Sequence, residues 1–217
     1  MQEKSCLLLI SGVTGSKPYF KDTISGNATL DSLLSYHYGK ENIIEIDTNA
    51  LRDSWTPDLL DKVSFTDITK FYLNGLRRRA IRSLIKATVD KLKAQGYTKI
   101  DLWAHSLGTV EAAGSKIDID TFIMFGSPIG FPTPVLRSTV KNELSFLGIT
   151  KPPLKCETLI NFWSPLDIVG SRPLTRDTRW RFGASDYKDI RSDTQHDLSD
   201  YLEFFLKIRK KLGLIEA

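Results

Sequence analysis

Cysteine and histidine are both scarce in this chain of 217 residues, which contains two cysteines and three histidines. Two cysteines cannot build a disulfide framework, although a single bridge between Cys6 and Cys156 stays open. Each cysteine lies in an apolar, strand-like segment, which favours two buried free thiols. Histidine and cysteine are also too few and too scattered for a zinc site, so we expect neither a metal nor an organic cofactor.

Long hydrophobic runs are absent as well. No segment approaches the roughly 18 apolar residues that a membrane-spanning helix needs. The apolar stretch at 6–10 is short, ends at Ser11-Gly12, and lacks the small-residue cleavage site of a signal peptide. We therefore interpret it as a buried strand and expect a cytoplasmic protein.

Charge of one sign is only slightly in excess, since 30 lysines and arginines against 26 aspartates and glutamates give a net charge of +4. No nucleic-acid-binding module accompanies this mild basicity, so we expect no nucleic-acid partner. Two segments with helical patterns carry many of the basic residues: Lys70, Arg77, Arg78, Arg79, Arg82 and Lys86 in one, and Lys207, Arg209, Lys210 and Lys211 in the other. Two explanations fit them, a solvated helix face, which we favour, and peripheral contact with an anionic membrane surface.

What the sequence does contain is a regular alternation of apolar runs and helical patterns, over a length that fits one domain spanning 1–217. Strands are predicted at about 6–10, 43–46, 100–104, 121–125, 158–163 and 178–182. Helices are predicted at about 28–38, 68–94, 107–113 and 198–212. Alternation of this kind is typical of βαβ units, so we predict an α/β fold with a mostly parallel central sheet of about six strands flanked by helices.

The Pro-rich stretch at 128–156, between the fourth and fifth predicted strands, is the main insertion. Its apolar residues suit a small lid or a pocket wall, and they suit equally well a simple cover for the sheet: Phe131, Val135, Leu136, Leu144, Phe146 and Leu147. The sequence does not decide between these interpretations.

The most informative segment runs from Ile100 to Ala113, where an apolar strand ends, a serine follows, and a helix begins. A turn this tight forces Ser106 into a strained backbone conformation at the carboxyl edge of the sheet. The residues two before and two after the serine must be small, and Ala104 and Gly108 meet that need. The helix N-terminus that follows favours negative charge at the serine. The alternative is that Ser106 only caps the helix.

The pattern Ala104-His105-Ser106-Leu107-Gly108 resembles the nucleophile elbow of α/β-hydrolases, commonly Gly-x-Ser-x-Gly. It departs from that pattern at Ala104, and Thr109 stands where many lipases have a further glycine. The resemblance implies a three-layer α/β-hydrolase fold of minimal size, as in small lipases and cutinase-like esterases, with Ser106 as nucleophile.

A serine hydroxyl needs a base to accept its proton. His105 adjoins the serine and its side chain must point elsewhere, and His37 falls in a predicted surface helix. His196 lies in a late loop before the last helix, and the resembling fold supplies its base from such a loop, in the order Ser, acid, His. We therefore predict His196 as the base; the alternative is a surface-loop histidine.

The acid that orients the base is predicted at Asp167, just beyond the fifth strand. The resemblance supports this choice, because similar lipases carry their acid in a turn of this kind. The competitors are Asp177, Asp193 and Asp197. The alternative for Asp167 is a turn aspartate that binds its own backbone.

An oxyanion hole needs two backbone N–H donors. We predict that of Leu107, directly after the nucleophile, and, by the resemblance, that of Val13 in the loop after the first strand, with Thr14 as second choice. The alternative is that Gly12 and Gly15 only form a turn. The stretch Phe125-Gly-Ser-Pro-Ile-Gly130 also resembles a strand end that leads to the acyl pocket. The predicted substrate contacts are Ile129 and Phe131, in and beside this stretch, and Thr14 in the loop after the first strand.

Together these residues predict a serine hydrolase that cleaves a small-molecule or lipid carboxylic ester through an acyl-enzyme. Two alternatives use the same fold. One is an acyltransferase or thioesterase with the same triad, and the other is a binding protein without activity.

Overall fold

A six-stranded parallel sheet forms the centre of the computed structural model, which describes residues 4–12, 19–46, 75–130, 154–167, 169–170, 172–174 and 182–215. The spatial order of the strands is β2-β1-β3-β4-β5-β6, and every neighbouring pair is parallel. The strands are β1 (Ser5–Ile10), β2 (Ile43–Glu45), β3 (Lys99–His105), β4 (Asp118–Phe125), β5 (Lys155–Trp163) and β6 (Asp186–Arg191).

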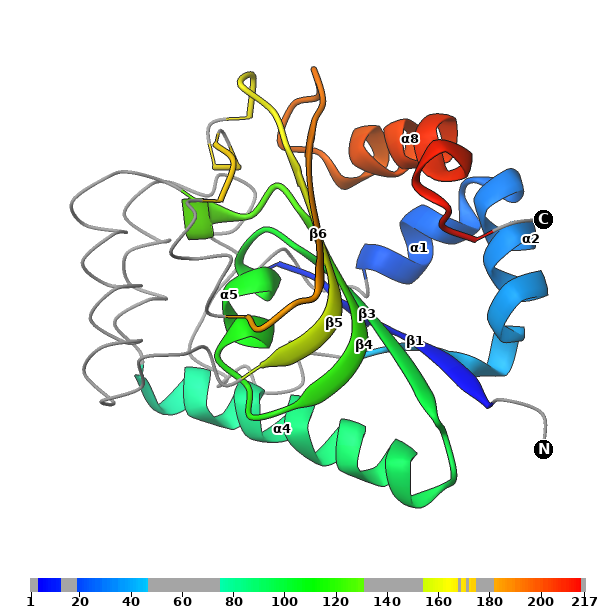
Figure 1. The fold of residues 1–217 in the computed structure, drawn as a ribbon, viewed down its shortest axis with the longest axis vertical. Coiled ribbons are helices and arrows are strands. Elements are labelled where there is room, and N and C mark those ends of the chain that lie inside the picture. The colour runs from blue at the N-terminus through cyan, green and yellow to red at the C-terminus, as the bar shows by residue number, and fades with distance from the viewer. Residues whose placement is uncertain are drawn as a thin grey trace, which may run out of the picture.

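Helices cover both faces of this sheet, as Figure 1 shows, with α4 and α5 on one side and α1, α2 and α8 on the other. Their bounds are α1 (Tyr19–Ser25), α2 (Ala28–Tyr38), α4 (Gly75–Ala94), α5 (Leu107–Ala113) and α8 (Leu198–Ile208). Short 3-10 turns lie at η1 (Lys40–Asn42), η4 (Pro128–Gly130) and η5 (Arg209–Leu212).

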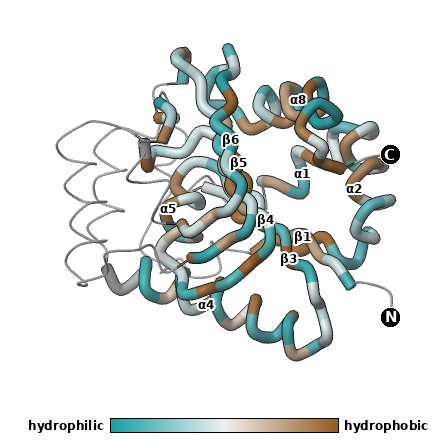
Figure 2. Tube along the Cα trace, viewed as in Figure 1, coloured by the Kyte–Doolittle hydropathy of each residue, from teal (hydrophilic) through white to brown (hydrophobic). Residues whose placement is uncertain are grey.

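Each face of the sheet has its own hydrophobic core, because side chains alternate along a strand. In β1, Cys6, Leu8 and Ile10 pack with residues of α4 and α5, whereas Leu7 and Leu9 pack with residues of α1, α2 and α8. Figure 2 shows hydrophobic residues along the central strands and at intervals along the flanking helices. Strands buried on both faces read as continuous apolar runs, which explains why the sequence reveals them.

Five strands lie where the sequence predicts them, and the helix at 28–38 is confirmed with Asn27 as its N-cap and Gly39 after its end. The last helix begins at Leu198 as predicted but ends at Ile208, where η5 follows. The long helix is described from Gly75, so 68–74 of that prediction lie outside the described residues.

The position predicted for the sixth strand is wrong at the one residue of 178–182 that the structure describes, since Phe182 lies in a turn. The sixth strand is β6, at the sheet edge, and its residues are only half-buried. Its charged sequence Asp-Tyr-Lys-Asp-Ile-Arg lacks the apolar run that marks the inner strands. Helix α1 also went unpredicted, because its seven residues carry too short a pattern.

One of the basic residues expected on the exposed face of α4 lies in the interior. Arg78 is buried, and its Nε lies 2.7 Å from Oε1 of Glu111 on α5. Arg82 binds the other carboxylate oxygen of Glu111 at 3.0 Å. The interpretation of Arg78 as part of a solvated or membrane-contacting face is therefore wrong, because its charge is neutralised inside the fold.

Both cysteines are free and buried, which confirms the expected thiols. Burial raises the pKa of Cys6 and that of Cys156 to about 12. Within the described part of the chain, no helix has the length and apolar character needed to cross a membrane.

Candidate active site

Ser106 stands at the carboxyl end of β3, immediately before the first residue of α5. Its backbone has φ 53° and ψ −129°, in a region that residues with a side chain rarely occupy. A Cβ at position 108 would lie 2.7 Å from the carbonyl oxygens of both Ile10 and Ser11, so only glycine fits there. The strained serine and the requirement for a small residue after it both agree with the elbow predicted from the sequence.

His196 meets Ser106 across the end of the sheet, with Nε2 2.9 Å from the serine Oγ. The histidine lies just before α8, in a loop fixed by Asp197, whose carboxylate caps the helix by accepting the N–H of Ser199 at 2.7 Å. Ser106 is buried, and the His196 side chain is 25% exposed, so solvent reaches the base more readily than the nucleophile.

Asp167 completes the chain of contacts, with Oδ2 2.9 Å from Nδ1 of His196. Its other oxygen accepts the N–H groups of Val169 at 2.7 Å and Gly170 at 2.8 Å. Burial alone would raise the pKa of Asp167, but the hydrogen bond and charge of His196, the Gly170 N–H and Tyr201 together lower it. An ionised Asp167 can only accept, so Nδ1 of His196 carries the hydrogen and Nε2 is left to accept the serine proton.

The competing aspartates take other positions. Asp193 is exposed and lies 3.8 Å from Arg191, and Asp197 serves as the cap of α8. Asp177 lies outside the described residues. Of the described candidates, Asp167 is the one that contacts His196.

Three residues near this pair have no role assigned from the sequence. Tyr201 on α8 is buried and donates its O–H to Oδ2 of Asp167 at 2.7 Å. Gly126 has φ +56°, and a Cβ there would lie 2.7 Å from the same carboxylate oxygen. Gly170 packs directly on Gly126, since a Cβ at position 170 would lie only 2.4 Å from the Gly126 Cα. The Gly126-Ser-Pro sequence hinted at a special turn, whereas nothing local signals Tyr201.

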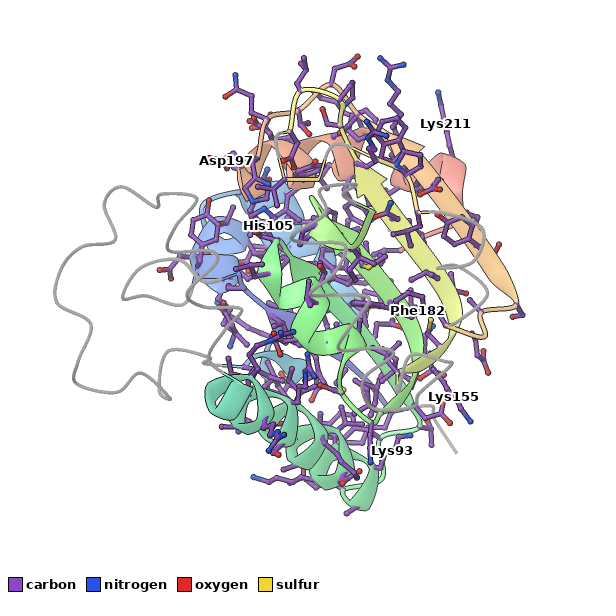
Figure 3. The ribbon with its side chains drawn as sticks, turned by 90° about the vertical axis from the view of Figure 1, so that its left-hand side faces the viewer. Lys93, His105, Lys155, Phe182, Asp197 and Lys211 are labelled. Carbon is purple, nitrogen blue, oxygen red and sulfur yellow. The ribbon has the colours of Figure 1, made fainter. Side chains whose placement is uncertain are left out.

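His105 packs against the base rather than against solvent. Its ring is stacked on that of His196, with centroids 4.9 Å apart and an interplanar angle of 30°. Burial, together with the charge of His196, lowers the pKa of His105 to about 3, so the ring is neutral at ordinary pH. Figure 3 shows His105 next to the loop that carries Asp197. A neutral ring here supports the imidazole of His196 without adding a competing positive charge.

The residues predicted for the oxyanion hole are only partly described. Leu107 is the first residue of α5, and N–H groups of a first helical turn have no acceptor within their helix. Val13 and Thr14 lie outside the described residues. Gly12 just before them packs on the nucleophile, since a Cβ at this position would lie 2.9 Å from Cβ of Ser106.

A single carboxylate binds the residues on both sides of segment 13–18. Glu45, at the end of β2, accepts the hydroxyl of Ser11 at 2.6 Å. It also accepts the N–H groups of Phe20 at 3.0 Å and Lys21 at 2.9 Å, in the first turn of α1. Glu45 thereby fixes the backbone next to Gly12, which contacts the nucleophile.

The predicted substrate contacts are less well defined. Ile129 lies in η4, is half-buried, and packs against the core formed with α4 and α5. Its N–H is 3.3 Å from Oγ of Ser127, which in turn bonds Thr109 at 2.7 Å. Residues 131–153 of the predicted lid or pocket wall, which include Phe131, lie outside the described residues. Within the described ranges, no group of three or more histidine, cysteine or acidic side chains could hold a metal ion.

Comparison with solved structures identifies proteins with a similar fold. The chain is similar to a cold-adapted esterase from an Arctic intertidal metagenomic library, with 15% identity and a TM-score of 0.58 over 99% of this chain and 85% of that one. It is similar to esterase PE8 at 21% identity, with a TM-score of 0.53 over 94% and 92% of the two chains.

A third similar structure is an α/β hydrolase enzyme from the metagenome of lagoon sediments at Mar Chica, Morocco. The two share 15% identity, with a TM-score of 0.50 over 98% of this chain and 92% of that chain. No protein-family model matches the sequence. No curated protein matches it either. The structural similarities extend over nearly the full chain, and they confirm the expected fold, with a sheet that is wholly parallel in the described residues.

Proposed function

We propose that this chain, which has the α/β-hydrolase fold, is a serine hydrolase that cleaves carboxylic esters. Ser106 is the nucleophile, His196 the general base and Asp167 the acid that orients His196. The observation that carries the proposal is the unbroken line of two 2.9 Å contacts from Ser106 Oγ through the imidazole to Asp167. A strained serine in line with a base and a buried carboxylate is the arrangement that activates a hydroxyl.

The first half of the reaction forms an acyl-enzyme. Oγ of Ser106 attacks the ester carbonyl carbon while Nε2 of His196 accepts the hydroxyl proton, and the carbonyl π electrons move to its oxygen. The tetrahedral intermediate then collapses. Its bond to the alcohol oxygen breaks, and the proton on Nε2 passes to that oxygen, so the alcohol leaves neutral.

The second half repeats these steps with water in place of the serine. Nε2 of His196 accepts a proton from water as the oxygen of that water adds to the acyl carbon. Collapse of the intermediate breaks the bond between the acyl carbon and Oγ of Ser106, releases the carboxylic acid, and returns the proton from Nε2 to Oγ. The oxyanion of each intermediate is stabilised by the N–H of Leu107 and, as second donor, that of Val13 or Thr14. The dipole of α5 is of the right sign to assist, because its N-terminus faces the serine.

Covalent labelling tests the nucleophile most directly. A fluorophosphonate probe is expected to label the wild-type chain and to leave Ser106→Ala unlabelled. Ser115→Ala is the matched control, since Ser115 is also buried beside α5 but its hydroxyl donates to the backbone carbonyl of Glu111. It should label like the wild type. Labelling that persists in Ser106→Ala would remove Ser106 from the mechanism.

Turnover of p-nitrophenyl esters of increasing acyl length tests the substrate class. We expect kcat/KM to fall by about three orders of magnitude or more in Ser106→Ala, and the chain-length optimum to indicate how much acyl chain the site accepts. Parallel assays with a thioester, and with an added alcohol as acceptor, separate hydrolysis of esters from the thioesterase and acyltransferase alternatives. Labelling without turnover of any ester would contradict the proposed substrate class.

A further inference from the structure

Four hydrogen-bond donors converge on the carboxylate of Asp167. Val169 and Gly170 donate backbone N–H groups to Oδ1, and His196 and Tyr201 both donate to Oδ2. The tyrosine bond, at 2.7 Å, is shorter than the histidine bond at 2.9 Å. The oxygen that orients the base is therefore shared between the base and a buried phenol.

The two donors to Oδ2 belong to one structural unit. His196 directly precedes Asp197, the N-cap of α8, and Tyr201 lies in the first turns of that helix. Figure 1 shows that α8 lies on the same face of the sheet as α1 and next to it. The phenol ring is packed between two other rings. Its centroid lies 6.3 Å from the ring centroid of Phe125 and 6.4 Å from that of His105. A rotation of Asp167 would break its bonds to His196 and Tyr201 at once.

We propose that Tyr201 is a positioning residue, which fixes the carboxylate of Asp167 in the plane that His196 needs and takes part of its charge. The inference rests on the proposed function, because it assigns a role within the same triad. Tyr201 touches no reacting atom and acts only through Asp167. Among the described residues, the other titratable or charged groups facing the Asp167–His196 pair or the rings around it are His105 from β3, Asp197 from the cap of α8, and Tyr19 from α1.

The direction of the effect follows from charge sharing. A phenol that donates to Oδ2 lowers the negative charge available to the imidazole. Without it, Asp167 holds the protonated form of His196 more strongly, so the inactive protonated base persists to higher pH. The acid limb of the kcat/KM profile should then move to higher pH, and the less firmly held carboxylate should lower kcat.

Tyr201→Phe tests this with little change of shape. We expect kcat for a p-nitrophenyl ester to fall by roughly five- to tenfold, KM to stay within about twofold, and the acid limb to move to higher pH. The matched control is Tyr38→Phe, because Tyr38 is another buried tyrosine whose O–H donates to a buried aspartate, Asp101, at 2.6 Å. That variant should keep the wild-type kcat and acid limb. Wild-type values in Tyr201→Phe, or equal changes in both variants, would overturn the proposal.

A second variant covers the case in which Tyr201→Phe does not fold. Incorporation of 3-fluorotyrosine at position 201 keeps the ring and strengthens the donor, so the acid limb should move to lower pH, opposite to the first variant. An acid limb that stays in place or moves to higher pH would contradict charge sharing.

A further readout does not depend on turnover. The proton on Nδ1 of His196 should give a downfield ¹H NMR signal that shifts in Tyr201→Phe and not in Tyr38→Phe. A wild-type chain that neither labels nor hydrolyses esters would overturn the proposed function. The NMR signal would still decide whether Tyr201 acts on the Asp167–His196 bond, and an unshifted signal would overturn this inference alone.

Discussion

Asp167 and Asp101 are two buried carboxylates, each of which accepts a tyrosine O–H, and their pKa values move in opposite directions. Burial raises the pKa of Asp101, inside β3, and the bond from Tyr38 does not compensate for it. The pKa of Asp167, at the carboxyl edge of the sheet, is lowered because His196, the Gly170 N–H and Tyr201 outweigh burial. At Asp167 the hydrogen bonds and the charge of His196 outweigh burial, whereas at Asp101 burial outweighs the hydrogen bonds of Tyr38 and Thr121 and the charge of Lys99.

The largest difference that we expect between Asp167 and Asp101 is in their effect on activity. Asp167→Asn is expected to lower kcat by about three to four orders of magnitude, because an amide neither holds the required tautomer of His196 nor stabilises its charged form. Asp101→Asn should stay within about threefold of wild type, because Asp101 lies toward the other end of β3. Steady-state kinetics on both variants decide it, and equal losses would mean that the site depends on general integrity of the sheet.

A third buried carboxylate, Glu111, sharpens the comparison through stability. It is bound by two guanidinium groups, those of Arg78 and Arg82. Glu111→Gln removes the buried negative charge that Arg78 and Arg82 bind, so we expect a loss of about 3–5 kcal/mol in the free energy of unfolding. Urea denaturation followed by circular dichroism measures it.

An exposed ion pair on α4 provides the control for Glu111→Gln. Lys86 and Asp90 form an exposed i,i+4 pair on the same helix, so Asp90→Asn is the control and should change stability by less than about 1 kcal/mol. If both variants cost the same, the buried pair contributes no more than a surface pair.

The smallest effect concerns stability against pH. The folded pKa of Asp167 is lowered, so its contribution is present above the unfolded value of about 3.9 and is lost as pH falls below it. The folded pKa of Asp101 is raised, so its contribution is present below about 3.9 and is lost as pH rises through the folded value. Thermal unfolding between about pH 3 and 7 should therefore show opposite changes from wild type in Asp167→Asn and Asp101→Asn.

The wild-type curve is needed as reference in that experiment. The lowered pKa of His105, about 3, makes the fold lose stability as pH falls below the unfolded histidine value of about 6.5. This loss is the same in wild type and Asp101→Asn, whereas Asp167→Asn enlarges it, because the charge of Asp167 raises the pKa of His105. Parallel curves for the two variants would show that the two carboxylates respond alike.

The sequence predicts the inner strands and the three triad candidates because these signals are local. A strand buried on both faces is a continuous apolar run, and the elbow lies within the few residues around Ser106. His196 and Asp167 follow from their positions after predicted elements together with the resemblance.

The remaining features depend on contacts between segments far apart in the chain. Tyr201 reaches Asp167 across 34 positions, and Arg78 reaches Glu111 across 33. A tyrosine or arginine in an amphipathic helix looks the same in the sequence whether it is exposed or paired. The position of the sixth strand was predicted wrongly for a related reason. β6 lies at the edge of the sheet, where a strand does not need a continuous apolar run.

The burial of Cys6 and Cys156 has a practical consequence for following this protein in solution. With their pKa near 12 and almost no access to solvent, neither thiol should react with a maleimide under native conditions. A cysteine introduced at Leu166, which is 61% exposed and adjoins Asp167, would then be the most reactive thiol of the folded protein. A single dye could be attached beside the mouth of the site without first removing the native cysteines.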